Sequence, residues 1–154
     1  MIGKRVSHNK SCLRFPLLHS SENLVAVFLG HMNVSRYFSA CGEGVFAIQS
    51  EMGLTASDMR TGRRLSFAVV HVESDFRAEL SAGDAIRLET SIIAIGTKSF
   101  TFRHRLLRSE DDATAFETEF KCVMLDLRTR RAAEVPDEVR EKAKAWLEDT
   151  EQGT

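Results

Sequence analysis

The sequence has no hydrophobic run long enough to cross a membrane and no segment typical of a signal peptide. Its first residues, MIGKRVSHNKSCLRF, include basic side chains but lack the ~7 to 15 consecutive apolar residues of a secretory leader. No later stretch approaches the ~20 apolar residues that a membrane-spanning helix needs. These absences predict a cytoplasmic protein without a membrane partner.

Cysteine is scarce, and metal-binding patterns are lacking. The three cysteines, Cys12, Cys41 and Cys122, form neither a CxxC pair nor a Cys/His pair at zinc spacing. An odd number of cysteines suits a reducing compartment better than a disulfide framework. His71 and His104 have no cysteine or acidic neighbour at metal-ligand spacing, so we expect structural roles for both. The sequence therefore predicts no metal and no other cofactor.

Neither sign of charge dominates the chain. It has 21 Lys and Arg against 22 Asp and Glu, a formal net charge of -1, which argues against a generally basic nucleic-acid binder. Its 154 residues match the length of one ordinary domain, and no repeat, linker or low-complexity segment divides them. We therefore expect a single domain over residues 1–154 and no nucleic-acid partner.

Apolar residues at spacings of three and four predict one long helix from Asn33 to about Met52. The apolar stripe consists of Val34, Tyr37, Phe38, Cys41, Val45, Ile48 and Met52. Gly42 and Gly44 lie inside this helix, where each glycine costs about 1 kcal/mol relative to alanine. We expect them to let a curved sheet or a neighbouring subunit approach the helix backbone closely. The alternative is a pair of glycines that the helix tolerates without such a role.

After a turn-rich segment over residues 55–64, the apolar period changes from near 3.6 to 2, which predicts strands. The four long strands are expected at 65–76, 85–95, 99–107 and 115–127. The turns between them are short enough to force antiparallel neighbours. A shift in the apolar phase at Val69 and Val70 indicates either a bulge or a strand covered on both faces.

Both ends of the chain carry weaker signals. Residues 12–18 read as a strand, but Pro16 restricts them to a sheet edge or an irregular segment. Residues 136–148 start with proline and form a charged, amphipathic pattern that predicts a C-terminal helix. One long helix followed by four strands buries its stripe only if the sheet wraps around it. The expected fold class is therefore α+β, with a curved antiparallel sheet around a central helix.

Two segments carry a family resemblance: LGHMNVSRYFSACGE and FAVVHVESDFRAELSAGDAIRLETSIIAIGTKSFTFRHRLL. Over residues 24–128 the chain resembles the hotdog-fold thioesterases, in particular the 4-hydroxybenzoyl-CoA thioesterase-like branch. The shared features are a GHxNxxxY helix start, an acidic residue two turns into the helix, a GD turn and a G-[ST]-x-S turn. The resemblance implies a hotdog fold, a homodimer or a tetramer built from two such dimers, and hydrolysis of acyl-CoA substrates between subunits.

The chain departs from this family at one position. Many members carry an aspartate three residues before the helix-start glycine, as nucleophile or general base, whereas Val27 stands here. Glu43 is our first candidate for the base, because it lies about two turns into the helix and almost opposite the apolar stripe. Some relatives use a helix glutamate in this way. The alternative is a solvated surface glutamate.

The helix start offers the remaining catalytic candidates. The backbone amides of Val34 and Ser35, at the positive end of the helix dipole, are predicted to hold the thioester oxygen as it becomes negative. Asn33 is a favoured helix cap, and the resemblance to plant acyl-carrier-protein thioesterases implies that it binds the water or the thioester; the two roles are compatible. His31 either orients Glu43, acts as the base itself, or is structural in a tight turn.

Basic residues near two turns are predicted to bind the phosphates of CoA, because guanidinium forks match phosphate oxygens. The candidates are Lys98, Arg103, Arg105, Arg128, Arg130 and Arg131. The alternative for each is a solvated surface charge. The resemblance also assigns Ser99 to the path of the pantetheine arm and Tyr37 to the substrate site.

Three functions are candidates for a chain of this kind. The favoured one is hydrolysis of an acyl-CoA to a free acid and CoA, and similarity to thioesterases encoded beside carnitine-degradation enzymes favours a small or polar acyl group. A noncatalytic acyl-CoA-binding protein is the alternative, because Val27 leaves the usual carboxylate position empty. A hotdog hydratase is disfavoured, because the chain has no D-x-N-x-x-H segment.

Overall fold

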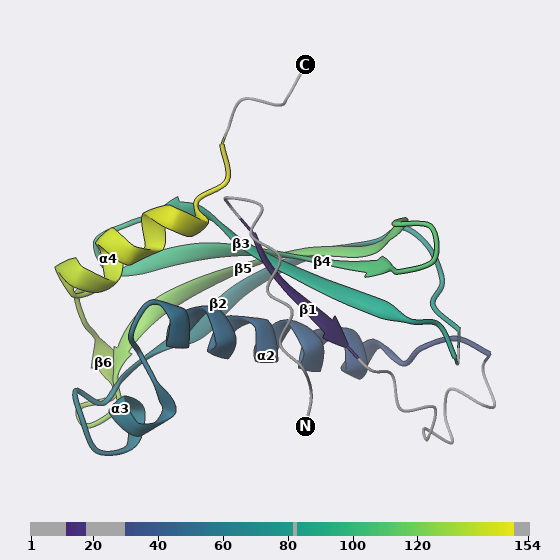
Figure 1. Ribbon diagram of the computed structural model, residues 1–154. Coiled ribbons are helices and arrows are strands. Elements are labelled where there is room, and N and C mark those ends of the chain that lie inside the picture. Colours follow the sequence, from purple (N-terminus) through teal and green to yellow (C-terminus); the bar gives the residue numbers. More distant parts are fainter. Residues whose placement is uncertain (1–11, 18–29, 82, 150–154) are drawn as a thin grey trace.

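The computed structural model describes residues 12–17, 30–81 and 83–149, and within them one long helix lies along one face of a curved sheet (Figure 1). The strands are β1 (Leu13–Leu17), β2 (Leu65–Phe76), β3 (Ile86–Ile95), β4 (Ser99–Arg108), β5 (Thr114–Asp126) and β6 (Arg131–Ala132). They pair in the order β1-β3-β4-β5-β2, with β6 on β5, and every pairing is antiparallel. The predicted fold class is confirmed.

The long helix α2 spans Val34–Glu51, close to the predicted bounds. Asn33 is its N-cap residue and Met52 its C-cap residue. Its predicted stripe lies against the sheet: Tyr37, Cys41, Val45 and Ile48 are buried together with Ala40, Gly44 and Gln49. Val34 is the exception and is 53% exposed. Val34 is the first residue of the helix, and its side chain lines a cavity instead of the core.

Gly44 and Gly42 differ sharply in their surroundings. A Cβ atom on Gly44 would lie 2.5 Å from Thr90 Oγ1 and 2.9 Å from Leu88 Cδ2, so the sheet approaches the helix backbone there. A Cβ atom on Gly42 would meet no described atom within 4 Å. The expected close approach of the sheet thus explains Gly44, whereas no contact within the described chain requires Gly42.

Beneath Gly44, polar side chains form a row across four strands. The cross-strand neighbours are Thr90 on β3, His104 on β4, Thr118 on β5 and Ser74 on β2. Thr90 Oγ1 lies 2.9 Å from His104 Nδ1, and Ser74 Oγ lies 2.7 Å from Thr118 Oγ1. These contacts give the buried polar atoms of the row hydrogen-bond partners, with one exception. His104 Nε2 is buried without a partner among the described residues.

This buried histidine should make stability depend on pH. Burial lowers the pKa of His104 from 6.5 to about 3, so the folded protein holds it neutral while the unfolded chain binds a proton below about pH 6.5. Stability is therefore full above that pH and falls as the pH drops toward 3, by about 2 kcal/mol between pH 7 and pH 5. Urea denaturation should show a smaller decrease between these pH values for His104→Gln than for the parent. Equal decreases would contradict the prediction.

Strand β2 forms one edge of the sheet. Its register against β5 shifts between Val69 and His71, so Val70 is a bulged residue. The predicted bulge is confirmed, and the alternative of a strand covered on both faces is not, because several large apolar side chains of β2 are exposed. These are Val69, Val70, Val72 and Phe76.

The C-terminal elements lie against the sheet near the β3–β4 turn (Figure 1). Helix α4 (Asp137–Ala143) continues into the 3₁₀ helix η1 (Lys144–Trp146), so the predicted helix over 136–148 ends earlier than expected. The chain leaves the helix because Leu147 pairs with Ile92 and the Glu148 N–H donates to Ile92 O. The Glu148 carboxylate then accepts hydrogen bonds from Arg103, Arg105 and Ser91.

Segment 55–64 was predicted as turns only, but it contains the short helix α3 (Ala56–Arg60). Thr55 caps this helix by accepting a hydrogen bond from the Asp58 N–H, and Asp58 then binds the Arg63 side chain. Among the described residues, no helix has both the length and the apolar character that a bilayer crossing requires.

Candidate functional site

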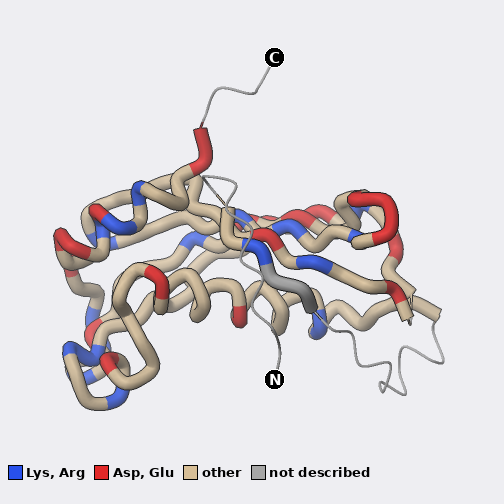
Figure 2. The backbone as a smooth tube through the Cα atoms, in the orientation of Figure 1, with Lys and Arg blue, Asp and Glu red and all other residues tan. Residues whose placement is uncertain are grey.

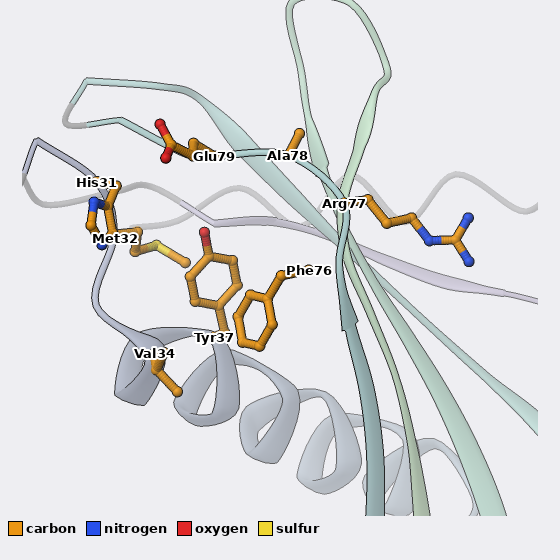
Figure 3. A pocket seen from close by; sticks show the side chains of 8 residues that line it. All are labelled: His31, Met32, Val34, Tyr37, Phe76, Arg77, Ala78 and Glu79. Atoms are coloured by element: carbon orange, nitrogen blue, oxygen red, sulfur yellow. The ribbon is translucent and has the colours of Figure 1, made fainter.

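A cavity of about 350 Å³ opens at the N-terminus of α2. Its walls come from the start of the helix and from the segment that follows β2 (Figure 3). The lining residues are His31, Met32, Val34, Tyr37, Phe76, Arg77, Ala78 and Glu79. The volume is at the lower end of the range of about 300 to 1,000 Å³ that is usual for small-molecule sites.

Leu80 holds the two walls of the cavity together. The Met32 N–H donates to Leu80 O over 2.7 Å, and the Tyr37 hydroxyl hydrogen-bonds the Leu80 backbone. On the other side, the Arg77 and Ala78 N–H groups both donate to Ala115 O on β5. The helix start and residues 77–80 are therefore fixed to each other and to the sheet.

Tyr37 is one of the two aromatic residues that line the cavity, and it is one of the residues predicted to bind substrate. Its ring packs edge-on against Phe76, with centroids 5.3 Å apart, and against Phe116 at 5.0 Å. Burial raises the pKa of Tyr37, and the nearby carboxylates of Glu79 and Asp84 raise it further. The phenol is therefore protonated at neutral pH.

Asn33 and His31 occupy different positions at the helix start. Asn33 Oδ1 accepts hydrogen bonds from the Ser35 N–H at 2.9 Å and the Ser35 hydroxyl at 2.8 Å, so Asn33 caps the helix. The Ser35 amide, one of the two predicted oxyanion donors, is thereby already bonded. The Val34 N–H makes no hydrogen bond to another described residue. His31 lines the cavity.

Glu43 lies outside the cavity of its own chain. It is exposed on the face of α2 that points away from the sheet, as the helical periodicity predicts. Phe46, three residues further along, is 57% exposed. A single chain therefore does not bring Glu43 and His31 into one pocket. Val27, which stands where many relatives have an aspartate, lies outside the described residues.

The predicted phosphate-binding residues also lie away from the cavity. Arg128 and Arg130 belong to the turn between β5 and β6, and Arg131 begins β6, which lies with α3 at the opposite end of α2 from its N-terminus (Figure 1). Lys and Arg residues gather at that end of the molecule (Figure 2). Lys98 and Ser99 lie in and after the β3–β4 turn, where Lys98 O accepts from the Met124 N–H.

Arg103 and Arg105 have partners on the outer face of the sheet. Arg103 pairs with Glu119 and Glu148, and Arg105 pairs with Glu117 and Glu148. The two guanidinium groups therefore hold the C-terminal segment on the sheet. This arrangement disfavours phosphate binding by both residues and, because both are ion-paired, also differs from the alternative of a solvated surface charge.

Sequence reasoning missed the acidic and aromatic wall of the cavity. Phe76 was assigned only to a strand, and Glu79 was not singled out. Among the described residues, no cluster of three His, Cys, Asp or Glu side chains could hold a metal ion. The described lining of the cavity offers a helix N-terminus, a histidine, a phenol, a guanidinium and a carboxylate.

Comparisons with known proteins place these features in context. The family model of the thioesterase-like superfamily matches residues 26–143. Among curated proteins, the L-carnitine dehydrogenase/betainyl-CoA thioesterase of Agrobacterium fabrum is 26% identical over 107 residues, which are 70% of this chain and 22% of that protein. The chain thus spans about a fifth of the length of this relative.

Solved structures share the fold. The hypothetical protein SAV2348 from Staphylococcus aureus, in complex with CoA, has a TM-score of 0.80 at 17% identity, covering 96% of this chain and 91% of that one. The 1,4-dihydroxy-2-naphthoyl-CoA thioesterase Slr0204 from Synechocystis has a TM-score of 0.70 at 15% identity, covering 87% and 95%. The hotdog architecture implied by the sequence is therefore confirmed.

Proposed function

We propose that this chain, which belongs to the thioesterase-like superfamily, hydrolyses an acyl-CoA thioester to a free acid and CoA. The observation that carries this proposal is a small cavity at the N-terminus of the central helix, in a chain whose family model spans residues 26–143. CoA in the structure of the Staphylococcus aureus protein and the thioester substrates named for other relatives support this substrate class.

The helix start would polarise the thioester. Its carbonyl oxygen would lie at the positive end of α2, where the Val34 N–H is the donor that remains available. Water would attack the carbonyl carbon while a base takes its proton. The carbon–sulfur bond would then break, and the CoA thiolate would accept a proton as it leaves. Glu43 is our candidate for the base, with Asn33 and His31 as the groups that orient the water or the thioester.

The site would be completed by a second copy of the chain. Strand β2 has no strand on its outer side within the described residues, and Val69, Val70 and Val72 are exposed along it. An exposed apolar edge of this kind is a template for pairing with another strand. We therefore expect a homodimer joined through β2, or a tetramer built from two such dimers. The partner would cover the open cavity. It would also supply the groups that lie far from the cavity of their own chain, such as Glu43.

The basic turns would then serve the other subunit. Because Lys98, Ser99 and the three arginines of residues 128–131 lie away from their own cavity, any contact they make with CoA would involve the substrate bound in the partner. The proposal keeps them as candidates for the phosphates and the pantetheine arm.

A lysine at the bulge of β2 should break the dimer. Val70→Lys places a charge on the apolar edge, and charged edge residues prevent strand pairing. Light scattering should show the mass of the variant falling to that of one chain, with loss of activity. Ala94→Lys, at an exposed position of β3, is the matched control and should keep the parent's mass. A fully active monomer would contradict the interfacial site.

The decisive test is release of free CoA from a panel of acyl-CoA thioesters, measured with a thiol reagent. The panel should include betainyl-CoA and 1,4-dihydroxy-2-naphthoyl-CoA, which appear in the names of relatives. Release from at least one of them supports the enzyme. Tight binding of acyl-CoA without release would instead support the noncatalytic alternative, and neither binding nor release would reject both.

A further inference from the structure

The cavity has two aromatic walls set almost at right angles. The rings of Tyr37 and Phe76 have an interplanar angle of 81° (Figure 3). Phe116 packs behind both, with centroids 5.0 Å from Tyr37 and 4.7 Å from Phe76, and so fixes their positions. Phe76 is nonetheless 54% exposed, so part of its ring is open to a ligand. Aromatic faces attract cations, with about 0.5 to 2 kcal/mol for each contact.

Among the described lining residues, the carboxylate of Glu79 is a negative charge without an ion-pair partner. Asp84 also lies close enough to act on the Tyr37 hydroxyl. Arg77 is the cationic lining residue, but its guanidinium points away from Tyr37 and Phe76 in Figure 3 and binds Glu117 at 3.0 Å. The remaining titratable lining residue is His31.

This charge discriminates between the two ends of an acyl-CoA. The nucleotide end carries phosphates, which a carboxylate repels, so the acidic cavity suits the acyl end. Among the other lining side chains, Val34 and Ala78 have no hydrogen-bonding group, and the Met32 thioether is only a weak acceptor for an N–H. The Tyr37 hydroxyl is already bonded to the Leu80 backbone. The surroundings therefore fit a methylated ammonium better than a primary amine.

We propose that Glu79, Tyr37 and Phe76 form a subsite for a short acyl group that ends in a quaternary ammonium. This inference rests on the proposed thioesterase function, since it assigns the acyl end of that substrate. The cavity volume of about 350 Å³ limits the acyl group to a short one. The carboxylate supplies charge attraction, and the exposed part of the Phe76 ring contacts the methyl groups, while Tyr37, which is only 3% exposed, holds Phe76 in place.

The test compares betainyl-CoA with 3,3-dimethylbutanoyl-CoA, in which carbon replaces the quaternary nitrogen and the shape is kept. The parent should hydrolyse the cationic thioester with a kcat/KM roughly tenfold or more above that of its neutral isostere. Glu79→Gln should lower this ratio toward one, and Phe76→Leu should lower it partly. Glu134→Gln, an exposed carboxylate outside the cavity, should leave the ratio unchanged.

Binding of the free acids gives a second measurement that needs no turnover. Calorimetry should detect glycine betaine binding to the parent more tightly than 3,3-dimethylbutanoate, with the difference lost in Glu79→Gln. A neutral isostere that is used and bound as well as the cationic form would overturn the subsite. So would a preference that survives Glu79→Gln. Absence of hydrolysis of every thioester, together with selective betaine binding, would reject the proposed function and keep the subsite.

Discussion

Turnover should fall by about 10² to 10⁴ when Glu43 is replaced by glutamine, the usual loss when a general base is removed. The amide is nearly isosteric with the carboxylate but does not take a proton from water at neutral pH. Glu43 is exposed on the outer face of α2, so the change leaves the core untouched. Steady-state hydrolysis of the best thioester of the panel measures the effect, and melting curves verify the fold.

The surroundings of Glu43 leave room for a ligand or a partner. Gly42 precedes it, and a Cβ atom on Gly42 would face open space in the described chain. That space is available to substrate or to the second subunit. Glu51→Gln, at another exposed position of the same helix, is the matched control and should keep full turnover. If Glu43→Gln is folded and as fast as the parent, Glu43 is a surface residue, and Asn33 with His31 become the leading pair.

The two helix glycines should respond in opposite directions to alanine. Gly44→Ala should lower the free energy of unfolding by about 1 to 3 kcal/mol, the typical cost of overpacking a core. The added methyl would lie 2.5 Å from Thr90 Oγ1 and 3.3 Å from His104 Nδ1, which are hydrogen-bonded to each other and have little freedom to move.

Gly42→Ala is the matched control two residues away. Its methyl group meets no described atom within 4 Å, so the higher helix propensity of alanine should raise stability by about 1 kcal/mol. Urea denaturation of both variants measures the difference. Equal stability of the two variants would show that the sheet moves away from the helix at little cost. If Gly42→Ala is stable but loses activity or the dimer, the space beside Gly42 is used by substrate or by the partner.

Long periodic patterns allowed most of the fold to be predicted. The helix and the four long strands lie within about one residue of their expected bounds, because each presents one face to a single core. The apolar phase shift at Val70 was a reliable sign of the bulge. Helix α3 was missed because five residues are too few for a period, although Thr55 and Asp58 carried a capping signal. Strand β6 has only two residues, Arg131 and Ala132, and depends on its pairing with β5.

The candidate site was less predictable than the fold. The capping role of Asn33 was among the expected alternatives, because it depends on residues next to it in sequence. The cavity is different, since Glu79 and Phe76 meet Tyr37 only when the chain returns from β2 to the helix start. The length of the C-terminal helix was overestimated for a similar reason. Contacts between Glu148 and β3 end it, and nothing in residues 136–148 encodes them.

The sheet order also has a consequence for synthesis of the protein in a cell. Strand β2 ends at Phe76, but its neighbour β5 begins only at Thr114. At about 5 to 20 residues per second, a ribosome needs several seconds to make the intervening chain. Throughout that interval the segment LSFAVVHV, rich in β-branched and apolar residues, has no native partner strand. Nascent chains of this protein therefore pass through a stage prone to aggregation. Slower synthesis of residues 77–113 should lengthen this stage and reduce yield, and chaperones that shield β2 should restore the yield.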